Sequence, residues 1–320
     1  MMGRILTLFD PLVRLLLVAI LLASVLPVTG EGRAIARSVS DAAIFLLFLL
    51  NGLRLPRAQV IAGLKNLRFL LPLTVFVFGA MGLAGWSVSA LAEYQLPASV
   101  ALGFIFLGVL PSTVQSATAY TSLADGNVAN SVVAAAVLNI LGVFITAPVM
   151  AIVASSGGQG IDLGALERIG MILLLPFLLG QLLQGRLGPM VADKKRLFSW
   201  MDRIAIAIAV YVAFSAAVEQ GLWALISLSE WGVFLCLVGL MLSVGFFGAW
   251  WLSGALSLCR ADRISFLFAG AQKSIAMGAP LAAVLFPPEI AGLVLLPVLI
   301  YHLLQLVISA PLASRFNPSR

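Results

Sequence analysis

The chain has 320 residues, of which 62% are hydrophobic and only 10% are charged, and its formal net charge is +6. A soluble domain carries about 25% charged residues and could not hide so much apolar surface, so that class is excluded. Each helical span of a bilayer takes about 20 apolar residues, which leaves room for roughly ten spans and for no sizeable soluble domain. The apolar runs are continuous, which argues against a transmembrane β-barrel. We therefore predict an all-α polytopic membrane protein, whose positive charge indicates cytoplasmic loops and not nucleic-acid binding.

The apolar runs predict ten membrane spans in chain order. The first is interpreted as a retained helix and not as a cleaved signal peptide, because no small-residue cleavage site follows it. The spans are expected at about residues 9–28, 35–53, 67–86, 97–121, 127–153, 166–186, 197–218, 231–256, 262–286 and 289–313.

The distribution of basic residues tests this span count. Fifteen of the 19 Lys and Arg residues fall on one side of the membrane, whereas only Arg33, Arg37 and Arg168 fall on the other and Lys273 lies within it. A miscounted span would scramble this asymmetry. The positive-inside rule therefore predicts an even number of spans, with both termini in the cytoplasm. We expect a bacterial inner (plasma) membrane location.

Ten spans divide into two halves of five. An odd number of spans in each half gives the halves opposite orientations, so a structural repeat would be inverted. The repeats are expected at residues 1–155 and 156–320, joined by a Gly-rich link at 155–160. Sequence similarity between the halves is slight, so this prediction follows from topology alone.

The fourth expected span carries the first polar interruption. Pro111 removes a helix hydrogen bond and frees carbonyl groups beside several hydroxyl and amide side chains. These groups could bind a solute, whereas the alternative is that they bond back to their own helix. Asn130 and Ser131, early in the fifth span, could line the same cavity. The candidate substrate-binding residues of this interruption are Ser112, Thr113, Gln115, Ser116 and Thr118.

The ninth expected span carries the second interruption, where Gln272, Lys273 and Ser274 lie between two glycines. A lysine at the bilayer centre costs about 2.5–3.5 kcal/mol on insertion scales, so it must face protein or water. Its ammonium group pairs with a carboxylate, holds an anionic substrate, or releases its proton and titrates. No acidic residue lies inside the fourth, fifth, eighth or tenth span. An anionic substrate would supply the missing counter-ion, and one interrupted span in each half is typical of a transporter site at the midplane.

His302 is the only histidine and shares a helix face with Gln305 in the last span. We expect a helix-packing hydrogen bond there, and a proton site formed by His302 together with Lys273 is the alternative. No arrangement of residues suggests an enzyme, a metal site or a cofactor. Besides the substrate, the small partner that we expect is a coupling ion, Na⁺ or H⁺.

Several motifs resemble those of the bile acid:sodium symporter superfamily. Residues 110–116 with 124–129 resemble its first crossing-helix motif, and residues 269–276 resemble its second. Further matches at 51–57, 175–181, 211–214 and 301–305 extend the resemblance over nearly the whole chain, and they indicate the branch that contains vertebrate sodium/bile acid cotransporter 7 and the yeast regulator of calcium homeostasis. The resemblance implies ten spans, a panel domain (spans 1, 2, 6 and 7), a core domain (spans 3–5 and 8–10), broken crossing helices in spans 4 and 9, and alternating access.

The chain departs from the family pattern at its ion site. The family carries a Glu that helps to coordinate two sodium ions, and Phe268 stands at that position here, while Lys273 replaces an Asn. Two intact sodium sites are therefore not expected. The Lys273 ammonium could replace a sodium ion, and transport could be uncoupled, proton-linked or coupled to one ion. The expected ligands of a bound ion are Ser116, Thr118, Asn130, Ser131 and Gln272.

We therefore expect a secondary transporter that moves an organic anion through the two interrupted spans. The alternative, from a different class, is a non-transporting regulatory membrane protein of calcium homeostasis.

Overall fold

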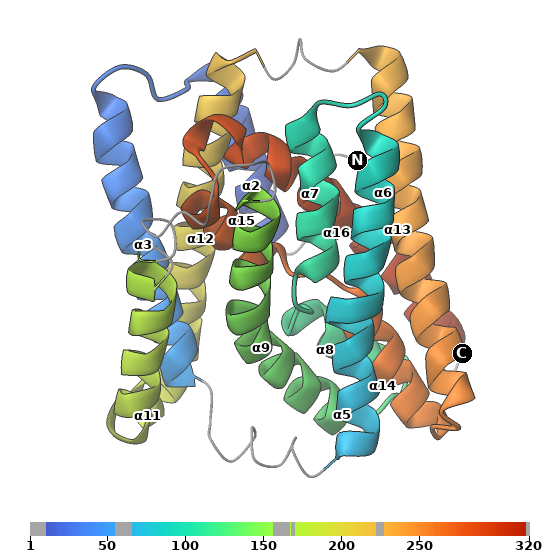
Figure 1. Cartoon of the computed structure of the whole chain (residues 1–320). Coiled ribbons are helices and arrows are strands. Elements are labelled where there is room, and N and C mark those ends of the chain that lie inside the picture. Colours follow the sequence, from blue (N-terminus) through green and yellow to red (C-terminus); the bar gives the residue numbers. More distant parts are fainter. Residues whose placement is uncertain (1–10, 55–65, 156–166, 168–169, 222–226, 318–320) are drawn as a thin grey trace, which may run out of the picture. The chain divides into compact units, whose positions relative to one another are not determined.

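The computed structural model describes residues 11–54, 66–155, 167, 170–221 and 227–317 (Figure 1). Within these ranges the chain is helical apart from turns and short extended segments, and no strand occurs among them. The all-α prediction is confirmed. The predicted link between the halves, residues 156–160, lies outside the described residues.

Seven helical stretches in the described part of the chain are long and apolar enough to cross a membrane. These are Gly32–Arg54, Leu67–Ala92, Val128–Val153, Gly170–Asp193, Lys195–Glu219, Leu228–Ala255 and Pro288–Phe316. Two shorter apolar helices are Pro11–Val25 and Ala98–Val109. The protein is therefore built as a polytopic membrane protein, and ten spans stay a prediction, because the expected spans at 9–28, 97–121 and 262–286 correspond to shorter helices.

The described residues form two compact units. The first takes its residues from Met1–Pro56, Ala151–Leu225 and Ala279–Leu293. Its helices are α2 (Pro11–Val25), α3 (Gly32–Arg54), the π-helix η2 (Gly170–Leu174) with α11 (Leu175–Asp193), and α12 (Lys195–Glu219). Helices α3 and α11 lie side by side (Figure 1). They approach closely at two glycines, because a Cβ atom on Gly52 would lie 2.3 Å from Phe177 O and one on Gly180 would lie 2.3 Å from Leu49 O. An ion pair between Arg54 and Asp202 joins α3 to α12.

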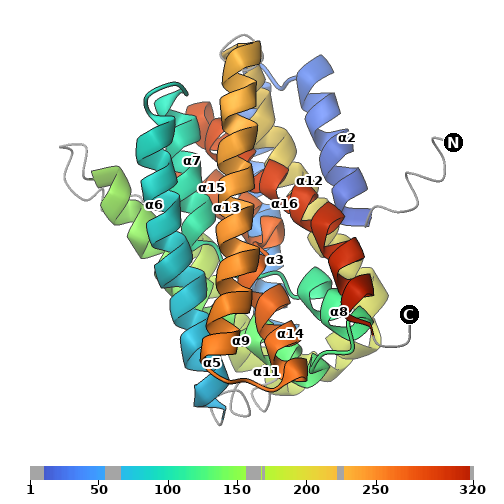
Figure 2. The same cartoon turned by 90° about the vertical axis from the view of Figure 1, so that its right-hand side faces the viewer.

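The second unit takes its residues from Arg57–Met150, Ile226–Gly278 and Val294–Arg320. It contains α5 (Leu67–Thr74), the π-helix η1 (Val75–Ala80), α6 (Met81–Ala92), α7 (Ala98–Val109), α8 (Gln115–Leu123), most of α9 (Val128–Ser155), α13 (Leu228–Ala255) and α14 (Arg260–Ala271). Helices α15 (Ile275–Leu285) and α16 (Pro288–Phe316) contribute residues to both units. Helix α13 packs against α14 and α6 (Figure 2).

Glycines also bring α6 and α7 into close contact within the second unit. A Cβ atom on Gly85 would lie 2.4 Å from Phe104 O, and one on Gly108 would lie 2.5 Å from Met81 O. Small residues let helix backbones approach closely where no water is available to drive association. This contact holds the end of α7 beside η1, the π-helix that precedes α6.

Short non-helical segments separate two pairs of helices in the second unit. Residues 110–114 lie between α7 and α8, and residues 272–274 lie between α14 and α15. Each segment carries the polar residues that the sequence singles out. For brevity we call residues 110–114 the first break and residues 272–274 the second break.

Candidate functional site

Five consecutive carbonyl groups, from Gly108 at the end of α7 to Ser112 in the first break, each accept a hydrogen bond from another segment of the second unit. A helix end leaves its last carbonyls unpaired, and they require partners when buried. Lys273 Nζ donates to Gly108 O (2.7 Å) and Leu110 O (2.8 Å), Thr146 Oγ1 to Val109 O (2.6 Å), Ser274 N to Pro111 O (3.0 Å), and Asn139 Nδ2 to Ser112 O (3.0 Å). The two breaks are therefore in direct contact, because two of these donors belong to the second break.

The second break is completed by side chains of α16. Gln305 Oε1 accepts from Lys273 N (2.8 Å), while Gln305 Nε2 donates to Lys273 O (3.0 Å). Tyr301 Oη donates to Ala271 O (2.6 Å). One amide side chain thus replaces both helical hydrogen bonds of Lys273, which lets the backbone leave the helix without unpaired groups.

Lys273 is fully buried, with 0% of its surface exposed. Its ammonium group donates to three backbone carbonyls: Val77 O (2.8 Å), Gly108 O (2.7 Å) and Leu110 O (2.8 Å). An ammonium group has three N–H donors and no acceptor. All three donors are therefore used in this conformation, and all three acceptors are backbone carbonyl oxygens.

The π-helix η1 explains why Val77 O is open to Lys273. In an α-helix the N–H of Met81 would bond to this carbonyl, but here it bonds to Phe76 O instead, one residue further back. This shift, which is characteristic of π-helices and common at functional sites, releases Val77 O from its helical partner. Val77, Gly108 and Leu110 are separated from Lys273 by 163–196 residues in the sequence.

A cluster of hydroxyl and amide side chains joins the start of α8 to the second break and to α16. Ser116 Oγ donates to Gln272 Oε1 and lies 2.8 Å from Thr113 Oγ1. Gln272 Nε2 donates to Ser309 Oγ (3.1 Å). The structure therefore brings Thr113, Ser116 and Gln272 together, as the sequence predicts for a shared site.

Two further predicted residues carry buried hydroxyl groups that form no hydrogen bond. These are Ser112 Oγ and Thr118 Oγ1. A buried hydroxyl group without a partner costs about 1–3 kcal/mol, so such atoms mark places where a ligand can be bound. Gln115, at the first residue of α8, is exposed. Ser274 Oγ accepts from Met277 N (3.2 Å) in the first turn of α15.

The structure places Asn130 and Ser131 apart from this cluster. Asn130 Nδ2 donates to Asp262 Oδ1 (2.8 Å), as does Asn127 Nδ2 (2.8 Å). Ser131 Oγ accepts from Thr121 Oγ1 (3.3 Å). The two bonds to Asp262 join the start of α9 and the turn before it to the first turn of α14. The hydrogen bonds of Asn130 and Ser131 described here therefore lie outside the polar cluster at the breaks.

His302 lies next to the second break, where its Nδ1 atom faces Gln305 Nε2 at 2.7 Å and Lys273 O at 3.3 Å. Because Gln305 Oε1 accepts from the Lys273 backbone, Gln305 Nε2 is the amide group that faces the ring. Nδ1 accepts from Gln305 in one tautomer and donates to Lys273 O in the other. The helix-packing bond and the proton-site role of His302 both stay predictions.

The sequence reading missed three residues of this region: Thr146, Ser309 and Asp262. Ser309 shares a helix face with His302 and Gln305, at a spacing of three and four residues, and this periodicity could have revealed it. Asp262 lies in the first turn of α14, where an acidic residue also has a general stabilising role. Thr146 lies on α9, and no local signal distinguishes it from a hydroxyl that bonds back to its own helix.

Phe268 occupies the position of the carboxylate that the family resemblance implies. It is fully buried, and its ring centroid lies 5.9 Å from that of Tyr120. A phenyl ring supplies no oxygen ligand for a small hard cation, and the described contacts of this position are those of an apolar packing residue.

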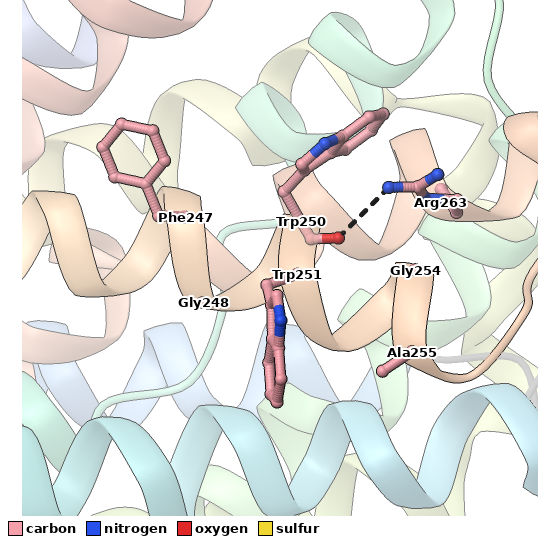
Figure 3. Close-up of a pocket in the computed structure, with 7 residues that line it drawn as sticks. All are labelled: Phe247, Gly248, Trp250, Trp251, Gly254, Ala255 and Arg263. Atoms are coloured by element: carbon pink, nitrogen blue, oxygen red, sulfur yellow. Dashed lines mark hydrogen bonds between the residues drawn. The ribbon is translucent and has the colours of Figure 1, made fainter.

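An open surface pocket of about 870 Å³ lies on α13 and the start of α14 (Figure 3). Arg263 contacts Trp250, with its Cζ atom 4.1 Å from the indole centroid, while Phe247 and Trp251 are largely exposed. Tryptophan and arginine near a helix end are typical of anchors at the membrane interface. The pocket contains none of the predicted site residues.

Comparison with known proteins identifies the family of this chain. The model of the SBF-like CPA transporter family matches residues 10–318. The chain belongs to this family. It is 34% identical over 320 residues to "Putative symporter YfeH" of Escherichia coli (strain K12), covering 98% of this chain and 95% of the relative. It is 35% identical over 312 residues to protein PA2026 of Pseudomonas aeruginosa, covering 95% and 92% of the two chains.

A more distant relative is sodium/bile acid cotransporter 7 of Mus musculus, which is 24% identical over 289 residues, 86% of this chain and 82% of the relative. The matching family model and the Escherichia coli and mouse relatives carry transporter names and not enzyme names, and the resemblance to the bile acid:sodium symporter superfamily is confirmed. The protein is an integral membrane protein of a transporter family.

Proposed function

We propose that the protein is a secondary active transporter that moves an organic anion by alternating access, with the solute bound where the two breaks meet. The observation that carries this proposal is the direct contact of the breaks, through Ser274 N and Pro111 O and through Ser116 and Gln272. Interrupted helices at the membrane midplane are the usual solute sites of secondary transporters.

The charge of the solute is inferred from the charged group beside the breaks. Helices α8 and α15 begin there while α7 and α14 end there, so positive and negative ends of the peptide dipoles are both present. The Lys273 ammonium adds a full positive charge. An anion is therefore favoured over a neutral or cationic solute, and the unpaired hydroxyls of Ser112 and Thr118 are suitable donors for it.

The proposed transport cycle uses two domains. We assign spans 1, 2, 6 and 7 to the panel and spans 3–5 and 8–10 to the core, in two inverted repeats at 1–155 and 156–320. The division of the described helices into two compact units, with both breaks in the second, supports this assignment. Ten spans, both termini in the cytoplasm and a bacterial inner-membrane location complete the proposal.

Coupling to sodium differs from that of the family pattern in this proposal. Phe268 replaces the carboxylate, and the Lys273 ammonium already provides a fixed cation in the core. A coupling ion, where one is used, would bind to oxygen atoms of Ser116, Thr118 and Gln272, whereas Asn130 and Ser131, which the sequence also suggests as ligands, form their hydrogen bonds with Asp262 and Thr121. We propose that transport needs at most one such ion.

The test uses the purified protein and a panel of bile acids, sulfonates and monocarboxylates, each paired with an uncharged analogue. An anion that binds the folded state raises thermal stability, by about 2.7 kcal/mol at a hundred times its Kd. In Gln272→Ala and Ser116→Ala the affinity for that anion should fall about tenfold or more, since each change removes a polar side chain proposed to bind it. Uptake of the same anion into proteoliposomes then measures transport.

Ser243→Ala is the matched control, because Ser243 Oγ bonds only to Gly239 O on its own helix at an exposed position. Unchanged affinity in Gln272→Ala and Ser116→Ala would contradict the proposed site. Failure of every solute to stabilise the protein, together with a specific protein partner in pull-down, would favour the regulatory alternative.

A further inference from the structure

We propose that the carbonyl groups of Val77, Gly108 and Leu110 form a monovalent-cation site that Lys273 fills with its own ammonium group. The inference deepens the proposed function, since it concerns how the transporter core is charged, but the site itself exists whether or not a solute is moved. Removal of the Lys273 side chain should therefore leave a site that binds a free cation of similar size.

The number of acceptors indicates a charged group. A neutral amine has two N–H donors and one lone pair, so in this cage its lone pair would face a carbonyl oxygen. An ammonium group satisfies all three contacts of 2.7–2.8 Å with its three donors. Val77 O is released by the π-helix, and Gly108 O lies in the last turn of α7, whose dipole favours a positive charge.

The positions of the three oxygens are determined by backbone packing and not by flexible side chains. At Gly85 and Gly108 the backbones of α6 and α7 lie so close together that a methyl group on either glycine would collide with the other helix. The cage is therefore preformed for a cation whose oxygen distances are about those of an ammonium group. Rings of backbone carbonyls replace the hydration shell of K⁺ in ion channels by the same chemistry.

Cation size gives the site a selectivity. Na⁺ is smaller than an ammonium ion and about the size of Ca²⁺, which binds oxygen at about 2.3–2.6 Å. The cage would have to contract to hold such an ion, and the glycine contacts between α6 and α7 oppose this. We therefore expect ammonium and K⁺ to bind better than Na⁺ once the lysine side chain is removed.

The experiment measures the thermal stability of Lys273→Ala in the chlorides of choline, Na⁺, K⁺, ammonium and n-propylammonium at matched ionic strength, with no organic anion present. The substitution deletes Cγ, Cδ, Cε and Nζ, which n-propylammonium reproduces atom for atom. Relative to choline, propylammonium, ammonium and K⁺ should raise the melting temperature by the order of 5 °C at a hundredfold excess over Kd, and Na⁺ by less.

Lys273→Met is the matched control. Its unbranched side chain fills the space that leads to the cage but supplies no charge, so no cation should stabilise it selectively. A folded Lys273→Ala protein that is equally stable in all five chlorides would overturn the inference. Equal responses of the Ala and Met variants would also overturn it, because they would indicate a general salt effect.

If Lys273→Ala does not fold in any of these salts, the wild-type protein is used to test whether the carbonyl cage holds a charged ammonium group. The chain has four lysines, at positions 65, 194, 195 and 273. In protein labelled with ε-¹⁵N-lysine we expect one ammonium signal whose protons exchange slowly with water at neutral pH and three signals whose protons exchange fast. The slow signal should be missing in Lys273→Met. Absence of a protected ammonium signal would contradict a caged cation. Because neither readout uses a solute, a failure here is distinguishable from a failure of the proposed transport function.

Discussion

Gln305 carries an unusual share of the hydrogen bonding at the second break. Its amide satisfies both backbone groups of Lys273 and also contacts His302, and it is completely buried. A residue with this role need not contact a solute at all. It maintains the backbone geometry on which the position of Lys273 depends.

Gln305→Leu should destabilise the protein by about 2–6 kcal/mol, because two buried backbone groups lose their partners at about 1–3 kcal/mol each. The measurement is denaturation of the purified protein in detergent. Gln220→Leu is the control, since Gln220 bonds to the carbonyls of Ala216 and Glu289 at an exposed position, and we expect a change within about 0.5 kcal/mol. Similar losses in both variants would contradict the role assigned to Gln305.

At the scale of elements, two features position the carbonyl cage. The π-helix η1 releases a carbonyl, and the glycine contact between α6 and α7 sets its distance from the end of α7. Neither feature contributes a side chain to the site. The geometry of the site therefore depends on positions where no functional side chain is present.

Gly85→Ala should destabilise the protein by about 1–3 kcal/mol, because the added Cβ atom would lie 2.4 Å from a backbone oxygen that cannot move aside easily. Gly239→Ala is the matched control on α13. A Cβ atom at Gly239 has nothing within 4 Å, so this variant should be neutral or slightly more stable. Denaturation midpoints compare the two, and equal stabilities would show that the α6–α7 contact is looser than described.

At the scale of the whole molecule, the predicted orientation can be tested with cysteines. Tyr94 is 85% exposed in the turn between α6 and α7, and the native Cys259 is exposed between α13 and α14. The distribution of basic residues places these two turns on opposite sides of the membrane. The second native cysteine, Cys236, is also exposed and must be replaced first.

In a Cys236→Ser background we expect a membrane-impermeant maleimide to label Tyr94→Cys in intact cells. Cys259 should react only after the membrane is permeabilised. Mass spectrometry of the purified protein locates each label. Labelling of Cys259 in intact cells would reverse the orientation, and equal labelling at both positions would be incompatible with the predicted span count.

The amino-acid sequence by itself determines the class of the protein and the location of its two polar interruptions. The length of the apolar runs, Pro111 and the glycines around Lys273 are local signals. They act on the backbone conformation of the residues next to them. The same signals identify Gln272, Lys273, Thr113 and Ser116 as neighbours of a site. The structure has non-helical segments at both interruptions and joins Thr113, Ser116 and Gln272 by hydrogen bonds.

Only the tertiary structure decided what Lys273 contacts. The sequence leaves a carboxylate, a substrate anion or loss of the proton as alternatives, whereas the structure shows three backbone carbonyls. Every residue has a carbonyl group, so the residue type does not indicate which carbonyl groups lack a helical hydrogen bond. That depends on a shifted hydrogen bond in η1 and on a helix contact between segments far apart in the chain. The same reason explains why Asn130 pairs with Asp262 and not with the breaks, since pairing of side chains across helices follows from packing and not from local pattern.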